Sequence, residues 1–202
     1  PARLPRILEV FNTMALGVCE GQQYDMDFES KQKVSVVEYM SMIELKTSVL
    51  VAGSAMMGAI LGGADEEQSR RLYQFAIELG MAFQLQDDYL DVYGDEKVFG
   101  KAIGGDITSN KKTYMLINAF NRANDEQRAE LVRWIEATEF DRAEKVAAVT
   151  RLYNEIGIGR PAQQKIEYFF AESRKYLAKV SVAEERKAEL AAYAERMMKR
   201  KY

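Results

Sequence analysis

The sequence predicts an all-α protein, and three observations support this fold class. Proline occurs only at positions 1, 5 and 161, which leaves a long interval in which helices can run without interruption. Alanine, leucine, glutamate and lysine, which favour helices, are frequent in that interval. Apolar residues recur at helical spacing, whereas the alternation typical of strands is hard to find. We therefore expect a single all-α domain over residues 1–202.

Composition excludes several functions. The net charge is −3 and no long basic run occurs, which argues against nucleic acid as a partner. Small residues interrupt the longest apolar stretch, residues 49–61, so no stable membrane insertion is expected. Cys19 is the only cysteine, which excludes an internal disulfide and suits a cytoplasmic protein. Histidine is absent, which excludes Ser-His and Cys-His catalysis and histidine-ligated zinc.

The first helix is expected from about Pro5 to Asp25. Its apolar stripe consists of Ile7, Leu8, Phe11, Met14, Ala15, Val18 and Cys19. It ends in the sequence GQQYD, where Gln22 and Asp25 are most simply interpreted as a polar helix end. The sequence enters this helix without an initiating methionine or a leader, so we expect it to be the middle of a longer protein.

A second helix is expected to begin after Ser35, because Ser35 and Glu38 form a capping-box pattern. It is expected to run to Leu61 and to stop at two glycines. Lys46 and Thr47 lie at the polar edge of this otherwise apolar helix, and extension of the lysine to solvent is its ordinary interpretation. The small residues between positions 53 and 59 allow a close neighbour or leave room for a ligand.

The third helix is expected from the capping segment 65–68 to about Gly94, and it carries an acidic cluster. Gly80 in its interior costs about 1 kcal/mol relative to alanine, which a closely approaching helix would explain. Asp87 and Asp91 share one face of this helix, with Asp88 beside them and Gln84 one turn before Asp88. Clustered carboxylates repel one another, so a cation is expected among them.

Residues 95–110 are expected to form a long functional loop, because they combine glycines with charged side chains. Carboxylates and lysines in one short stretch suggest Mg²⁺ and phosphate together. After the loop, four shorter helices and a terminal one are expected at about residues 112–122, 124–134, 141–157, 161–179 and 183 onward. Pro161 is expected at the first helical position of the fourth.

The stretch FQLQDDYLD from Phe83 to Asp91, followed by Gly100-Lys101, Gly105-Asp106 and Asn110-Lys111-Lys112, resembles the second aspartate-rich motif of the trans-isoprenyl diphosphate synthases. This family, also called the polyprenyl synthetases, includes farnesyl and geranylgeranyl diphosphate synthases. The Gly21-Gln22-x-x-Asp25 segment and the Lys46-Thr47 pair resemble two further motifs of the family, in the family's order. The first aspartate-rich motif and the early Gly-Lys and Arg set are not in this sequence, so the chain resembles the C-terminal part of such a synthase.

The resemblance implies an isoprenoid synthase-type helical bundle around a central cavity, lacking its N-terminal helices in this chain. It implies Mg²⁺-dependent condensation of an allylic prenyl diphosphate with isopentenyl diphosphate by a homodimer. The metal-binding residues that it implies are Asp87, Asp88 and Asp91. The substrate-binding residues are Gln22, Lys46, Thr47, Gln84, Lys101 and Lys111, and the catalytic ones among them are Lys46, Thr47, Gln84 and Lys101. Because the remaining ligands belong to the absent motif, we expect the chain alone to be inactive, and its exposed apolar surface to make it self-associate.

Two other functions remain open at this stage. One is another class I terpenoid enzyme, either a cyclase or a head-to-head synthase, which also uses acidic metal motifs in an all-α fold. The Gly-Lys, Gly-Asp and Lys-Lys flanks favour the chain-elongating family instead. The other is a non-catalytic regulatory subunit of a prenyl synthase, which the intact set of charged residues argues against. Product length cannot be inferred, because the family sets it near the first motif.

Overall fold

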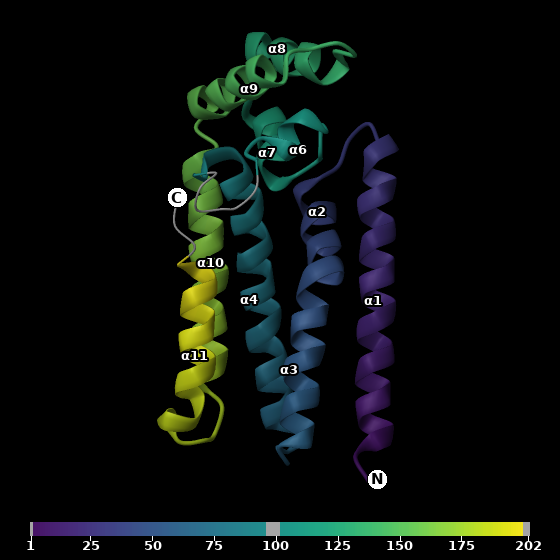
Figure 1. Cartoon of the computed structure of the whole chain (residues 1–202), viewed down its shortest axis with the longest axis vertical. Coiled ribbons are helices and arrows are strands. Elements are labelled where there is room, and N and C mark those ends of the chain that lie inside the picture. The colour runs from purple at the N-terminus through teal and green to yellow at the C-terminus, as the bar shows by residue number, and fades with distance from the viewer. Residues whose placement is uncertain (1, 96–101, 200–202) are drawn as a thin grey trace.

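The computed structural model describes residues 2–95 and 102–199, and within these ranges it is helical and contains no strand. The predicted all-α bundle is therefore confirmed. Long helices stand side by side along most of the molecule, and a group of shorter helices covers one end, which is the upper end in Figure 1. The predicted site residues on the long helices lie toward this covered end.

The first helix, α1 (Leu4–Ser30), continues past the predicted end near Asp25. Gly21 does not terminate it, because this glycine serves packing instead. A Cβ added at Gly21 would lie 2.3 Å from the backbone nitrogen of Lys46, so only glycine lets the two helices approach this closely. Phe28, one of the added residues, is buried in the core, which stabilises the extra turn.

The second predicted helix is one continuous rod with a widened turn in its middle. It comprises α2 (Val36–Ile43), the π-helical turn η1 (Glu44–Ser48) and α3 (Val49–Leu61). The predicted capping box is confirmed, since the Ser35 side chain accepts from the Glu38 backbone and Glu38 accepts from the Ser35 backbone. The π turn contains Lys46 and Thr47, and such turns are frequent at functional sites.

Of the helices in the described ranges, the rod Val36–Leu61 alone has the length and apolar composition of a membrane span. This is weak evidence, because core helices of soluble proteins share these properties. The rod packs between α1 and α4 (Glu66–Tyr93), as a core helix does (Figure 1).

The central helix α4 begins after Asp65, whose side chain accepts from the backbone of Gln68 at 2.8 Å. Its most extensive neighbours are α3 and α10 (Gly159–Ala178). The close neighbour expected at Gly80 is Ser48 of η1, because a Cβ at Gly80 would lie 2.7 Å from the Ser48 Cα. The interior glycine thus brings α4 against the π turn.

The helices at the covered end are short and well capped. They are α6 (Gly105–Thr108), α7 (Tyr114–Arg122), α8 (Asp125–Glu136) and α9 (Arg142–Ile156). Thr113, Asn124 and Asp141 cap the last three of these by side-chain hydrogen bonds. The turn of α6 lies inside the segment that the sequence analysis predicted to be a loop.

The chain then returns along α4 through α10 and α11 (Glu184–Met198) (Figure 1). The prediction that Pro161 occupies the first helical position was wrong, because α10 begins two residues earlier, at Gly159. A proline is still tolerated there, since the N–H groups of a first helical turn have no partner within the helix.

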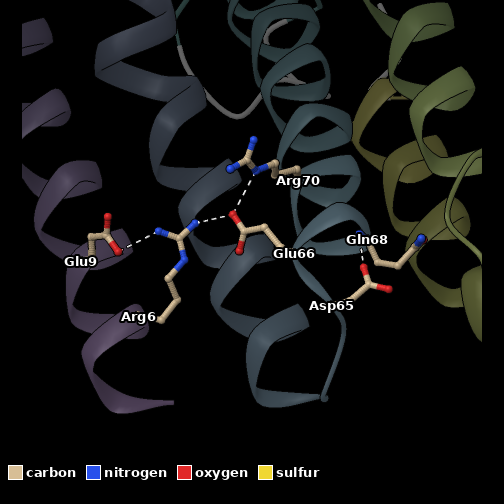
Figure 2. Close-up of polar contacts among 6 residues, drawn as sticks. All are labelled: Arg6, Glu9, Asp65, Glu66, Gln68 and Arg70. Carbon is tan, nitrogen blue, oxygen red and sulfur yellow. Dashed lines mark hydrogen bonds and ion pairs between the residues drawn. The ribbon is translucent and has the colours of Figure 1, made fainter. Parts of the chain in front are cut away.

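At the opposite end of the bundle, exposed ion pairs join α1 to α4 (Figure 2). The Arg6 guanidinium donates to Glu9 at 2.8 Å and to Glu66 at 2.7 Å, and Arg70 donates to Glu66 at 2.9 Å. Exposed pairs of this kind contribute little stability, typically below about 1 kcal/mol each. This end lies about 30 Å along α4 from the acidic cluster, at 1.5 Å per helical residue.

Candidate functional site

Lys46 forms an ion pair with a residue on the neighbouring helix. Its Nζ lies 2.5 Å from Oδ2 of Asp25, and both side chains are partly buried. Asp25 follows Gly21 by four residues and therefore lies on the same face of α1, the face that Gly21 brings against the π turn. The interpretation of Asp25 as an ordinary helix end was wrong, and the signal for its role was its spacing from Gly21.

A chain of partly or fully buried hydrogen bonds links the π turn to α4. The Thr47 hydroxyl donates to Gln84 Oε1 at 2.9 Å, and Gln84 Nε2 donates to Asp88 Oδ1 at 3.1 Å. The Tyr39 hydroxyl donates to the other Asp88 oxygen through a short hydrogen bond. The amide of Gln84 is therefore fixed in one orientation, with its carbonyl oxygen toward Thr47.

Tyr39 belongs to the candidate site through its hydrogen bond to Asp88, and it was not among the residues predicted from the sequence. It lies in the apolar stripe of α2, is 2% exposed and packs against Tyr114, so it resembles an ordinary core residue. Its hydroxyl group was the only available signal. Burial, together with the charge of Asp88, raises its pKa well above the usual value, so Tyr39 remains a donor.

Asp88 is almost fully buried, at 3% exposed. Burial raises its pKa to about 7, although the hydrogen bonds from Tyr39 and Gln84 oppose the shift. Both of its oxygens accept hydrogen bonds from these side chains. Asp88 therefore orients the Gln84 amide by accepting its hydrogen bond, and it is more buried than Asp87 and Asp91.

Asp91 is held by the backbone that begins α6. The Gly105 and Asp106 N–H groups donate to its two carboxylate oxygens at 3.2 and 2.9 Å. Gly104, with φ of 78°, makes the turn that presents these groups. Burial raises the pKa of Asp91, as does the nearby charge of Asp87, while the two backbone donors oppose the shift.

Asp106 and Lys111 complete the charged cluster. Burial and the charge of Asp91 raise the pKa of Asp106 to about 6. Burial alone would lower the pKa of Lys111, but the charges of surrounding carboxylates, Asp106 first, outweigh it and raise that pKa. A lysine that is itself partly buried thus lies among acids from α1, α4 and α6.

The cluster has the donor chemistry of a divalent-cation site. Burial is the main cause of the raised pKa values of Asp91 and Asp106, and repulsion among Asp87, Asp91 and Asp106 adds to it, so a cation would relieve both. In the part of the chain that the structure describes, no three acidic side chains are already grouped at metal-binding distance. Mg²⁺ uses few carboxylates and takes its remaining ligands from water and phosphate, so these residues fit it.

The other predicted site residues lie in different environments. Gln22 is exposed on α1 and takes no part in the hydrogen bonds described above. Lys101 and Gly100 lie outside the described residues. Lys112 is directed to the end of α1, where its Nζ donates to the Glu29 carbonyl oxygen at 3.1 Å.

Comparison with known proteins identifies the family. The sequence model of the polyprenyl synthetase family matches residues 2–156 of this chain. The chain belongs to the polyprenyl synthetase family. The resemblance inferred from the motifs is therefore confirmed, and the fold is that of the solved polyprenyl synthetase structures.

Similar proteins include several archaeal synthases. The geranylgeranyl diphosphate synthase of Methanosarcina mazei is 43% identical over 122 residues, which are 60% of this chain and 38% of that protein. The geranylfarnesyl diphosphate synthase of Natronomonas pharaonis is 39% identical over 118 residues, or 58% of this chain and 35% of that protein. The aligned regions thus span well under half the length of these relatives.

Solved structures of polyprenyl synthetases superpose over nearly the whole chain. The crystal structure of a geranylgeranyl pyrophosphate synthase has a TM-score of 0.91 at 40% identity, covering 99% of this chain and 62% of that one. Another is a geranylgeranyl pyrophosphate synthase from Corynebacterium glutamicum, complexed with isoprenyl diphosphate and magnesium. Its TM-score is 0.90 at 28% identity, and the match covers 98% of this chain and 56% of that one. The chain spans less than two thirds of either protein.

Proposed function

We propose that this chain forms one wall of the active site of a Mg²⁺-dependent prenyltransferase, which condenses an allylic prenyl diphosphate with isopentenyl diphosphate. The observation that carries the proposal is a convergence at one end of the bundle. Carboxylates that suit a metal, lysines that suit a diphosphate and the Thr47–Gln84 pair come together there from α1, η1, α4 and the segment after α6. Membership of the polyprenyl synthetase family supports it.

Asp87, Asp88 and Asp91 are the residues we propose for the Mg²⁺ site. Asp87 and Asp91 would bind the ion, Asp91 through the lone pairs that its two backbone hydrogen bonds leave free, and Asp106 would add negative charge beside them. Asp88 would act mainly through its hydrogen bond to Gln84, because it is almost fully buried and both of its oxygens accept from side chains. Bound Mg²⁺ supplies positive charge that stabilises the departing diphosphate. The magnesium-containing structure from Corynebacterium glutamicum supports this choice of ion.

Lys46, Lys101 and Lys111 are proposed to contact the diphosphate oxygens, with Gln22 at the edge of the site. Lys46 is held in advance by its ion pair with Asp25, and Lys111 lies in the field of several carboxylates, of which Asp106 acts most strongly. Donors fixed before the substrate arrives lose little freedom during the reaction. Their positive charge opposes the build-up of negative charge on the leaving group as the allylic C–O bond breaks.

The oxygens of Thr47 and Gln84 are proposed to face the allylic carbons, which become cationic as the diphosphate leaves. The Thr47 proton is donated to Gln84, so the lone pairs of the Thr47 oxygen remain available. A fixed dipole of this kind stabilises positive charge without forming a bond to it. No histidine is needed as a base, because the released diphosphate can accept the proton lost after condensation.

We further propose that the protein is a single-domain, cytoplasmic homodimer that binds no nucleic acid. The apolar residues on the outer face of α1 support association, since Leu4, Leu8, Phe11 and Leu16 are each at least 48% exposed. Size-exclusion chromatography with light scattering tests this proposal. We expect a dimer or larger species, and a stable soluble monomer would contradict the proposal.

The decisive experiment for function combines binding with turnover. Calorimetric titration of the chain with inorganic pyrophosphate in the presence of Mg²⁺ should show binding that neither component gives alone. An assay of the purified 202-residue chain with radiolabelled isopentenyl diphosphate and an allylic diphosphate should yield no elongated product, because the first aspartate-rich motif is not among these residues. Absence of Mg²⁺-dependent pyrophosphate binding would refute the proposed site. Robust elongation would refute the expectation that these residues form only one wall of the active site. The relatives are named for products of different lengths, so no product length is assigned.

A further inference from the structure

A lysine lies buried directly behind the charged cluster. Lys145 on α9 is 0% exposed, and its Nζ donates to Oδ1 of Asn110 at 2.7 Å. The same amine lies 4.1 Å from the centroid of the Phe140 ring, a favourable position for a cation. Over residues 2–95 and 102–199, no carboxylate forms an ion pair with it. Burying a cation without a carboxylate partner is unfavourable. The position of the Lys145 amine against Asn110 therefore needs a functional or structural reason.

Asn110 occupies a backbone conformation that favours glycine. With φ of 55°, it is the only non-glycine residue with positive φ in the part of the chain that the structure describes. Asparagine tolerates this region better than most residues, although it is still strained there by roughly 1 kcal/mol. Both ends of its side-chain amide are engaged, because Nδ2 also donates to the Ile135 carbonyl oxygen at 3.0 Å. α8 and α9 thus fix this turn from two sides.

The turn directly precedes Lys111. The Lys111 backbone N–H donates to the Asp106 carbonyl oxygen at 2.9 Å, and its amine lies among the carboxylates of the cluster. Asp106, Asn110, Lys111 and Lys145 line one small cavity of about 10 Å³, which leaves no room for a substrate. Lys145 therefore acts through Asn110 and does not itself reach a ligand.

We propose that Lys145 is a positioning residue for diphosphate binding, which fixes the left-handed Asn110 turn and thereby holds Lys111 toward the acidic cluster. This inference rests on the proposed function, because Lys111 matters only if the site binds a diphosphate. It assigns a role to α9, a helix that contributes none of the predicted site residues.

The test measures the affinity of the chain for inorganic pyrophosphate in the presence of Mg²⁺. Lys145→Met keeps the length of the side chain and removes its donor, and we expect roughly tenfold weaker binding, within the range of coupled neighbours. Lys111→Met should weaken binding by at least as much. The double variant should bind no more weakly than Lys111→Met alone, because both substitutions remove the same contribution. Full additivity in this cycle would overturn the proposal.

Lys187 provides a matched control. It is another buried lysine, at 6% exposed, but it lies on α11, where its amine pairs with Glu184 at 2.6 Å and donates to the Val180 carbonyl oxygen. Lys187→Met should lower the melting temperature yet leave pyrophosphate affinity unchanged. Equal losses of affinity in Lys145→Met and Lys187→Met would show a general loosening of the fold and would overturn the proposal.

If Lys145→Met does not fold, Asn110→Gly carries the test. Glycine adopts positive φ without strain, so the variant should fold, but it offers no amide for α8 and α9 to hold. We expect weaker pyrophosphate binding, and unchanged affinity would overturn the inference alone. Absence of binding by the unsubstituted chain would overturn both the inference and the proposed function, which distinguishes the two failures.

Discussion

The two ends of α4 carry the same kinds of charged residue in opposite settings. At the N-terminal end, Glu66 is exposed and receives hydrogen bonds from Arg70 and Arg6, which lower its pKa (Figure 2). At the C-terminal end, burial raises the pKa of Asp88 to about 7 and that of Asp91 above its usual range. Acids at the first end are neutralised by partners within the chain, whereas acids at the second remain poorly compensated. This difference identifies the end at which an external cation would gain most.

The largest expected effect is on binding at the buried end. Asp91→Asn removes a carboxylate while keeping its shape, and we expect Mg²⁺-dependent pyrophosphate affinity to fall by roughly 100-fold. In the ligand-free chain the loss of a repulsive charge is opposed by the loss of one acceptor, because the Asn NH2 group cannot accept from the Gly105 or Asp106 N–H, so we expect only a small net change in stability. Calorimetry and urea unfolding measure the two quantities. Unchanged affinity would show that the carboxylate of Asp91 does not contribute to Mg²⁺-dependent binding at the buried end of α4.

The pH dependence of stability should also reflect the buried end. The folded pKa values of Asp88 and Asp106, about 7 and about 6, exceed the ordinary value of 3.8, so the folded state binds these protons more tightly than the unfolded state. Stability of the ligand-free chain should therefore rise as pH falls from 8 to 5, with an upper bound of roughly 4 kcal/mol for the two groups together. Below about pH 4 this gain is complete, and loss of the ion pair of Glu38, whose pKa is about 2, then opposes it.

Urea unfolding at several pH values measures this slope. Asp88→Asn should flatten it over the same window, because the substituted side chain no longer titrates. A stability that is flat between pH 5 and pH 8 in the unsubstituted chain would mean that the buried acids are better compensated than their surroundings indicate.

A smaller effect is expected from one buried hydroxyl. Tyr39→Phe removes the donor to Asp88 and leaves a buried acceptor less satisfied, which should cost about 1–2 kcal/mol of unfolding free energy. Tyr93→Phe is the control, because the buried Tyr93 hydroxyl has no hydrogen-bond partner among residues 2–95 and 102–199. Its removal should be neutral or stabilising. Equal costs in the two variants would show that the Tyr39 hydroxyl has no special role.

The smallest effect should come from the exposed end. Glu66→Gln breaks two solvent-exposed ion pairs, and such pairs contribute little when water competes with them. We expect a smaller loss of melting temperature than Tyr39→Phe causes, and no change in pyrophosphate affinity. A loss of affinity would mean that the two ends of α4 are coupled.

Local sequence signals predicted much of the fold. The capping boxes at Ser35 and Asn124 and the cap at Asp141 were confirmed, because such caps depend only on residues three apart. The helical periodicity gave the number and order of the long helices. The π turn could not be predicted, since it depends on how α1 and α4 pack against residues 44–48.

The candidate site was predicted less completely than the fold. The motif residues Lys46, Thr47, Gln84 and Asp88 do come together, three of them in one hydrogen-bonded chain. Tyr39 was missed, and the pairing of Asp25 with Lys46 was not predicted, because both roles depend on contacts between helices far apart in the sequence.

The π turn sets an angular offset between the two halves of the rod. One residue corresponds to about 100° of rotation in an α-helix, so the extra residue in η1 displaces the faces of α2 relative to those of α3 by that angle. Deleting a single residue there would let the rod revert to regular helical winding without breaking it. Tyr39 and the buried face of α3 would then no longer both point inward, so the length of this segment tolerates change far less than its composition does.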